Sequence, residues 1–179
     1  MTTVRAVTAF RRSCALGFSS EFTNKLRLER CVSVLTELVV AFAVMALCVV
    51  IHIIGMASLT VVLLRRRSSI EQRLRFVTSS VLLIIVFSVV ILLHVLETTI
   101  WAGFYWWQRL FENFETALYF SFKTYTTIGY GDVLLPERWR LLSGVEGLSG
   151  VLLCGLSTAF LFAIVNALFQ MRIRPRADS

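Results

Sequence analysis

Three long runs that are almost free of charged residues constrain the fold of this chain more than any other feature. They cover residues 34–64, 79–100 and 144–169. A helix of about 20 apolar residues spans the hydrocarbon core of a bilayer, so each run is long enough to cross a membrane once. Hydrophobic residues make up 57% of the chain, above the share of about half that is usual in soluble domains. We therefore expect an all-α membrane protein with three transmembrane helices.

Basic residues gather in the segments beside these runs. Residues 1–33 form a basic arm, which we expect to be disordered, to lie on a surface, or to follow from a start codon placed too early. The loop 65–78 holds five arginines and one glutamate, and the tail 170–179 holds three arginines. Cytoplasmic loops of membrane proteins are rich in Lys and Arg, so we predict that this loop and the tail are cytoplasmic. The net charge of +7 is then explained by topology and lipid headgroups, with no nucleic-acid partner.

The region 101–143 is predicted to lie on the outer side. It carries four basic and four acidic residues. It opens with an aromatic cluster, a composition favoured where a bilayer meets water: Trp101, Phe104, Tyr105, Trp106 and Trp107. Three spans would also put the N-terminus outside. That placement conflicts with the basic arm, and the sequence leaves the conflict open.

The segment between the second and third runs ends in Thr-Thr-Ile-Gly-Tyr-Gly-Asp at residues 126–132. Residues 113–126 are predicted to form a short helix, with Asn113 as its N-cap. Gly129 and Gly131 stand at alternate positions in the segment that follows. A strand that turns successive carbonyls to one side must alternate ordinary and left-handed backbone, which glycine adopts without steric cost. Such carbonyls can replace the water shell of a potassium ion.

This geometry assigns a role to each residue of the motif. We expect K+ to be coordinated by oxygens of Thr127, Ile128, Gly129 and Tyr130, in a filter that runs from Thr127 to Gly131. Thr127 can add its hydroxyl oxygen at the inner end. Tyr130 can brace the strand from behind, where an aromatic ring with a polar tip packs and donates a hydrogen bond. Thr126, Lys123 and Asp132 are expected to support the filter.

The motif resembles the potassium channel signature, with isoleucine in place of the commoner valine. Residues 79–169 resemble the pore domain of two-helix bacterial potassium channels and the pore repeats of two-pore-domain channels. The resemblance implies an outer helix at 79–100, a pore helix at 113–126, a filter at 127–131 and an inner helix at 144–169. The expected fold is thus three transmembrane helices, with a re-entrant pore helix and selectivity filter between the second and third.

Lys123 departs from the family pattern. In the best-known bacterial potassium channel the corresponding position holds a glutamate, which shares a hydrogen bond with the aspartate closing the signature, here Asp132. An unpaired lysine in a poorly solvated site behind the filter would be costly. We therefore predict a Lys123–Asp132 ion pair that braces the filter. The alternative is that Lys123 extends to outer water and pairs with nothing.

The predicted function is passive, potassium-selective conduction. One pore segment per chain predicts a homotetramer, because a closed ring of filter carbonyls needs four strands. The expected partners are K+ ions and the lipid bilayer, with no cofactor, and the expected location is the bacterial inner membrane. The alternative is a non-conducting or weakly selective regulator or transporter subunit that retains the motif. Nothing in the sequence indicates an enzyme, because it shows no nucleophile, metal cluster or phosphate loop.

Ionisable residues inside the apolar runs are further candidates, because charge at membrane depth is costly. His94 and Glu97 share one face of the second helix. They either anchor that helix at the outer interface beside Trp101 or form a proton-sensing pair coupled to the pore. Glu37 is expected at the outer interface, and His52 is expected to hydrogen-bond to another helix. A metal site from His52 and His94 is a less favoured alternative.

Gly150 lies in the third run, close to the position of the gating hinge in the related channels. Small residues let membrane helices pack closely, which is the first interpretation of this glycine. A hinge that bends when the inner helix opens is the second.

Overall fold

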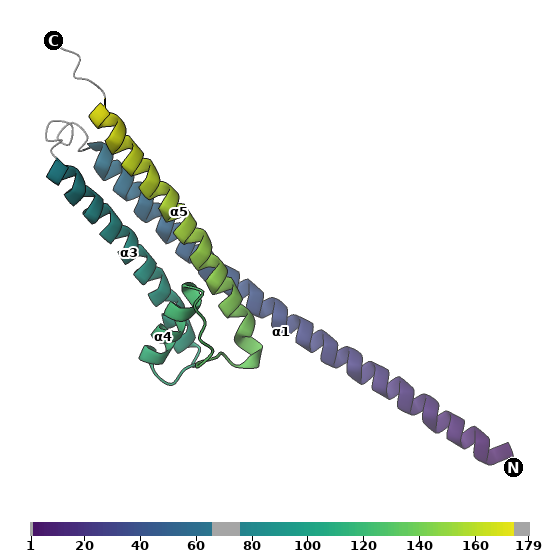
Figure 1. Ribbon diagram of the computed structural model, residues 1–179. Helices are drawn as coiled ribbons and strands as arrows, with labels where there is room; N and C mark the ends of the chain where they lie inside the picture. Colours follow the sequence, from purple (N-terminus) through teal and green to yellow (C-terminus); the bar gives the residue numbers. More distant parts are fainter. Residues whose placement is uncertain (1, 66–75, 174–179) are drawn as a thin grey trace, which may run out of the picture. The chain divides into compact units, whose positions relative to one another are not determined.

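The computed structural model describes the backbone of residues 2–65 and 76–173, and side chains at 32, 34–65 and 79–170. The chain divides into two units, Met1–Val40 and Ala41–Ser179. Every element in the described ranges is helical (Figure 1). The elements are α1 (Thr2–Arg65), α3 (Phe76–Trp107), α4 (Phe114–Tyr125), the 3-10 turn η1 (Glu137–Trp139) and α5 (Arg140–Ile173).

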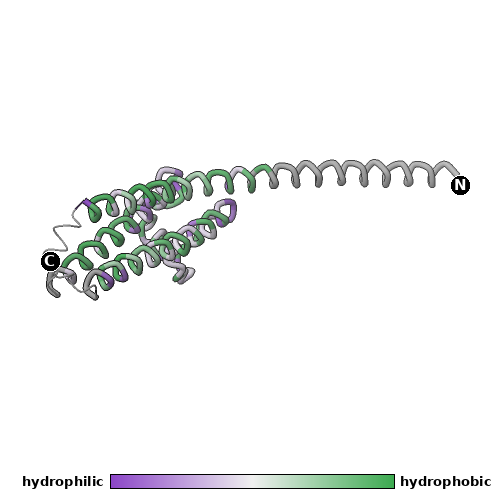
Figure 2. The backbone as a smooth tube through the Cα atoms, turned by 90° about the horizontal axis from the view of Figure 1, so that it is seen from above, coloured by the Kyte–Doolittle hydropathy of each residue, from purple (hydrophilic) through white to green (hydrophobic). Residues whose placement is uncertain are grey.

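Three stretches of these helices are long and apolar enough to cross a membrane. They are Val34–Arg65 in α1, Ser79–Trp107 in α3 and Glu137–Gln170, which covers η1 and α5 as far as Gln170. Figure 2 shows hydrophobic residues along most of their length. The prediction of an all-α chain with three membrane-spanning helices is therefore confirmed. The second unit holds α3, α4, α5 and the part of α1 from Ala41 onward.

The N-terminal arm predicted from the sequence falls within the described backbone of α1. The described backbone of α1 is helical from Thr2 to Arg65 without a break. Its first 33 residues contain one glycine and no proline, and these are the two residues that disfavour a helix interior most strongly. The sequence before residue 34 therefore contains few residues that would prevent a helix from starting earlier. The loop 66–75, predicted to be cytoplasmic, lies outside the described residues.

The short helix α4 packs against both α3 and α5. Asn113 caps it as predicted, because its side chain accepts a hydrogen bond from the Thr116 N–H at 2.7 Å. The aromatic cluster at the end of α3 is divided between two environments. Trp101 and Tyr105 are fully buried, whereas Trp106 and Trp107 are 52% and 76% exposed. Helix α4 covers Trp101 and Tyr105 on that face of α3, and the position of the cluster at the membrane interface stays a prediction.

Gly150 marks the place where α5 passes the end of α4. A Cβ added at Gly150 would lie 2.1 Å from the carbonyl oxygen of Tyr125, and one at Gly147 would lie 3.3 Å from that of Thr124. A contact of 2.1 Å with a backbone atom leaves no room for a side chain. Close packing therefore accounts for Gly150, and its use as a hinge stays a prediction.

Candidate functional site

The segment after α4 has the alternating backbone that the motif predicts. Gly129 and Gly131 have φ angles of +51° and +78°, and Thr127 between them and α4 has a φ of +60°. Left-handed backbone thus occurs at every second residue from 127 to 131. Glycine takes this conformation at no steric cost. A threonine there is strained, and strain of this kind persists only where surrounding contacts enforce it.

Backbone hydrogen bonds hold the start of this strand against the last turn of α4. The Ile128 and Gly129 N–H groups donate to the Lys123 carbonyl at 2.9 and 3.2 Å, and the Thr127 N–H donates to the Thr124 carbonyl at 2.9 Å. The hydroxyl of Thr126 donates to the Phe122 carbonyl at 2.6 Å. These bonds use the carbonyls that a helix C-terminus leaves without intrahelical partners. The strand is therefore anchored to α4 from its first residue.

The side chains of the strand find little cover within one chain. Ile128 is 55% exposed and Tyr130 is 72% exposed. The prediction that Tyr130 braces the strand from behind stays a prediction.

Three residues close the other end of the strand onto α4, and we call them the Lys123 clasp. They are Tyr119, Lys123 and Asp132. Lys123 is 5% exposed, and its ammonium forms an ion pair with the Asp132 carboxylate. The Tyr119 hydroxyl donates to the second Asp132 oxygen at 2.8 Å, and the Lys123 Nζ lies 4.5 Å from the Tyr119 ring centre. The contact between Lys123 and Asp132 is thus the one predicted, and its effect on the filter stays a prediction.

The clasp also fixes the charge on Asp132. Hydrogen bonds from Lys123 and then from Tyr119 lower the pKa of this carboxyl to about 2. The same bond to Asp132 raises the pKa of the Tyr119 hydroxyl. Donors that bind the ionised form of a carboxyl favour that form. Asp132 is therefore an anion throughout the pH range in which proteins normally work.

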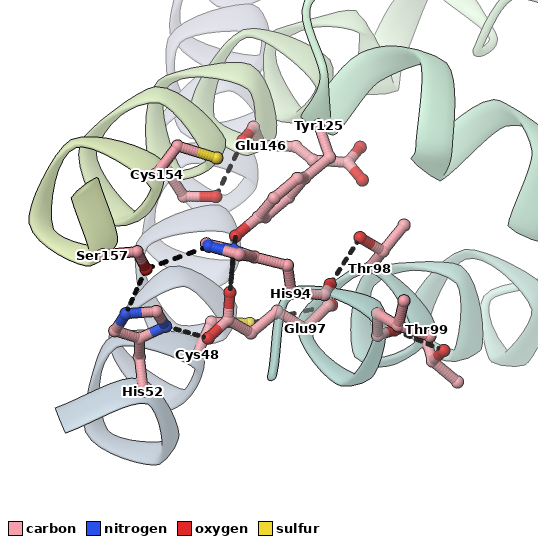
Figure 3. Close-up of polar contacts among 12 residues, drawn as sticks. Cys48, His52, His94, Glu97, Thr98, Thr99, Tyr125, Glu146, Cys154 and Ser157 are labelled. Atoms are coloured by element: carbon pink, nitrogen blue, oxygen red, sulfur yellow. Dashed lines mark hydrogen bonds and ion pairs between the residues drawn. The ribbon is translucent and has the colours of Figure 1, made fainter. Parts of the chain in front are cut away.

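A second group of polar side chains meets around the Tyr125 hydroxyl, and we call it the buried cluster (Figure 3). Its members come from α1, α3, α4 and α5: His52, His94, Glu97, Tyr125 and Ser157. The Glu97 carboxylate contacts His52 Nδ1 at 2.7 Å and accepts from the Tyr125 hydroxyl at 2.5 Å. The Ser157 hydroxyl lies 3.0 Å from Nε2 of each histidine. The ring of polar contacts closes through His94 Nδ1, 2.9 Å from the Tyr125 hydroxyl.

The cluster decides between the interpretations of the membrane-depth residues. Glu97 is fully buried, so an anchor at the outer interface is wrong: α1 packs over this face of α3 and excludes water from it. His52 hydrogen-bonds to another helix, as predicted. Glu37 is 4% exposed rather than open to an interface. The two members Tyr125 and Ser157 are absent from the residues predicted from sequence.

Glu146 is a further buried acid that the sequence patterns do not single out. It is fully buried in α5, where it accepts hydrogen bonds from Ser121 at 2.6 Å and Tyr105 at 2.7 Å. These bonds tie α5 to α4 and α3. The available signal was a single acid within a long apolar run, which marks a functional or structural site by default.

Comparison with known proteins agrees with this architecture. The sequence model of a family described as ion channel matches residues 79–167. A calcium-gated potassium channel, TvoK of Thermoplasma volcanium, is 39% identical over 66 residues, which are 36% of this chain and 18% of the relative. The chain thus spans less than a fifth of that relative's length. No solved structure matches the chain.

Proposed function

The chain belongs to the ion channel family through residues 79–167, and from this premise we propose that it conducts K+ selectively. One observation carries the proposal: left-handed backbone at Thr127, Gly129 and Gly131, directly after a short helix between two membrane-spanning helices. Alternation of this kind directs successive carbonyls to one side of a strand. Rings of such carbonyls are the means by which potassium channels replace the hydration shell of the ion.

The filter in this proposal comprises Thr127 to Gly131, with K+ bound by oxygens of Thr127, Ile128, Gly129 and Tyr130. Helix α4 is then the pore helix, and its C-terminus lies at the inner mouth of the filter. The partial negative charge of a helix C-terminus favours a cation there. The Lys123 clasp holds the outer end of the strand, so the strand is fixed to α4 at both ends.

A homotetramer is the assembly that this filter requires. One chain supplies one filter strand, and a closed carbonyl ring needs four. Exposed side chains of the strand and of α5 support the assembly: Ile128 and Tyr130 are exposed, and Val151 and Phe162 of α5 are 56% and 71% exposed. Contact with neighbouring copies would cover these surfaces. The mass of the purified protein in detergent should correspond to four chains, and a dimer as the only conducting species would contradict the proposal.

The protein is an integral membrane protein, and we propose the bacterial inner membrane as its location. Helices α3 and α5 are then the outer and inner pore helices, with the motif facing outside and the Arg-rich loop 65–78 inside. A cysteine at Ser68 should resist an impermeant thiol reagent added to intact cells, while a cysteine at Arg138 should react. Reaction at Ser68 alone would reverse this orientation.

Flux in liposomes tests the function. The purified protein should pass K+ much faster than Na+, and barium should block the flux. Gly129→Ala should abolish it, because a Cβ opposes the left-handed backbone at this residue. Gly103→Ala is the matched control: a Cβ there meets no atom within 4 Å, so flux should persist. Equal K+ and Na+ flux, or no flux from a folded tetramer, would favour a non-conducting regulator instead.

A further inference from the structure

The buried cluster is joined by five hydrogen-bonding contacts, and each contact needs one proton. Two of them reach Glu97, from His52 and from Tyr125. Two more join Ser157 to the two histidine rings. The last joins His94 to the Tyr125 hydroxyl. A hydrogen bond between two atoms that both lack a proton does not form, so the cluster must hold five protons in these positions.

With neutral histidines and an ionised Glu97, the cluster has only four. A hydroxyl carries one proton, a neutral imidazole carries one, and a carboxylate carries none. Ser157, Tyr125 and the two rings therefore supply one each. One contact would be left with two lone pairs facing each other. An unsatisfied polar contact in a buried site costs about 1–3 kcal/mol.

With Glu97 ionised, the missing proton must lie on a histidine; the other arrangement with five protons is a protonated Glu97 that donates to His52 Nδ1 between two neutral rings. Tyr125 gives its proton to Glu97, so the contact between His94 Nδ1 and Tyr125 must be made by a ring N–H. Ser157 has one proton for two rings, so one Nε2 must also donate. An ionised Glu97 can only accept, so His52 Nδ1 then donates to it. In either orientation of the Ser157 hydroxyl, one ring carries protons on both nitrogens.

We propose that the buried cluster is a proton-binding site, in which one imidazolium is paired with the ionised carboxylate of Glu97. The charges of the pair cancel, as burial at membrane depth requires. Glu97 is surrounded by donors that favour its ionised form: His52 and Tyr125 contact its two oxygens, and His94 Nδ1 lies 3.2 Å from one of them.

A metal ion fits the same residues less well. One ligand atom from each of His52, His94 and Glu97 lies within 4.8 Å of the others. However, His52 Nδ1 and Glu97 Oε1 are 2.7 Å apart, whereas two ligands on zinc bonds of about 2.1 Å are separated by about 3.4 Å in a tetrahedral site. A divalent ion beside a single carboxylate would also leave a net positive charge in a buried place. A proton leaves none.

The other titratable groups around the cluster leave this count unchanged. Cys48 of α1 contacts the Glu97 backbone carbonyl at 4.0 Å, and Cys154 of α5 lies beside the cluster (Figure 3). Glu146 of α5 is occupied by Ser121 and Tyr105. None of these three side chains makes one of the five contacts.

The cluster is coupled to the candidate filter through Tyr125, the last residue of α4 and two residues before Thr127. The proton is bound at low pH and leaves as the pH rises. Its loss removes one of the five contacts, so the C-terminus of α4 is held less firmly. Resting on the proposed function, this coupling predicts that K+ flux falls as the pH rises through the titration of the cluster.

Ring-nitrogen NMR of the full-length protein in liposomes tests the proton site without any assay of conduction. The chain has only two histidines, and both belong to the cluster, so 15N-histidine labelling reports on it alone. Near neutral pH we expect one ring with both nitrogens protonated and one neutral ring. His52→Gln assigns the two sets of signals. Two neutral rings, or two charged ones, would overturn the proposal, as would stoichiometric binding of added Zn2+ through both rings.

Flux measured over a range of pH tests the coupling. Wild-type flux should fall with rising pH, and Glu97→Gln should lose this dependence because its side chain cannot pair with an imidazolium. Thr99→Val is the matched control, since Thr99 lies on α3 and its hydroxyl donates to the Val95 carbonyl of the same helix. The same pH dependence in Glu97→Gln would overturn the coupling. If the wild type passes no K+, the proposed function fails, and the NMR result still decides the proton site.

Discussion

The Lys123 clasp and the buried cluster flank the same stretch of chain, from the end of α4 to Asp132, but they use charge differently. The clasp is a fixed ion pair, half open to water: Asp132 has a side chain 47% exposed. The cluster lies among four helices, and Glu97 within it is fully buried. A solvated pair holds its geometry over a wide pH range. A sealed network depends on each proton that it contains.

The largest expected effect comes from removing the acid at the centre of the cluster. Glu97→Ala would leave a buried imidazolium without its counter-charge, a change that costs about 3–5 kcal/mol in comparable buried pairs. Thermal unfolding in detergent should show a large fall in the midpoint temperature. Glu112→Ala, which removes an exposed acid, should leave the midpoint almost unchanged. An equal fall in midpoint temperature for the two variants would contradict the distinction between a buried and a solvated acid.

A second variant tests whether both regions depend on the position of α4 against α5. Gly150→Ala places a Cβ 2.1 Å from the Tyr125 carbonyl oxygen, and overpacking of this kind costs about 1–3 kcal/mol. Because the obstacle is backbone, we expect the upper end of that range and a loss of flux. Gly155→Ala is the control, since a Cβ there meets no atom within 4 Å. Flux and thermal stability should be measured on both variants. Wild-type values for Gly150→Ala would contradict the close packing of α5 against α4.

Substitutions in the Lys123 clasp should cause a smaller loss of flux and stability than Gly150→Ala, and the loss should depend on which partner is replaced. Asp132→Asn leaves the buried Lys123 ammonium without its anion, whereas Lys123→Met leaves a solvated carboxylate. We therefore expect Asp132→Asn to reduce flux and filter stability more than Lys123→Met. The double variant should recover part of the loss, because it removes the stranded charge. Strictly additive effects in this cycle would mean that the two residues do not act as a pair.

The smallest expected effect is the change in folding stability at acid pH that comes from Asp132. Asp132 has a folded pKa of about 2, below the value of about 3.9 for an unfolded chain. A lowered acid pKa adds stability above the unfolded value, and the contribution is lost as the pH falls through the folded value. The difference in stability between wild type and Asp132→Asn should therefore be constant above about pH 5 and shrink between about pH 5 and pH 1. A difference that varies between neutral and mildly acid pH would contradict the assignment.

The two regions also differ in how far the sequence could predict them. Lys123 lies in the last turn of α4, and Asp132 follows nine residues later at the end of the strand. The resemblance to known pore segments was therefore enough to predict that they pair. The cluster joins His52 to Ser157, which are 105 residues apart. Helices that are apolar on every side do not reveal which face meets which neighbour. His52, His94 and Glu97 could be named as candidates, but their meeting with Tyr125 and Ser157 required the packed structure.

Other differences have equally local causes. The buried position of Trp101 could not be distinguished from an interfacial one, because tryptophan suits both and only the path of α4 decides. Glu146 lies in the apolar run 144–169, and the hydrophobic pattern of that run predicts a membrane-spanning helix without indicating a partner for the acid. By contrast, the three spans, the Asn113 cap and the close packing at Gly150 follow from residue chemistry alone. The alternating glycines likewise indicated the left-handed positions, although not that Thr127 would join them.

The reversal potential of the reconstituted protein in a planar bilayer tests the central claim most directly. With KCl on one side and an equal concentration of NaCl on the other, a K+-selective filter allows current to be carried almost entirely by K+. We predict a large reversal potential, with the NaCl side positive relative to the KCl side because K+ carries the current. The barium-sensitive part of the current should have the same reversal potential. A reversal potential near zero would show that Na+ and K+ pass alike, and it would contradict potassium selection by Thr127 to Gly131.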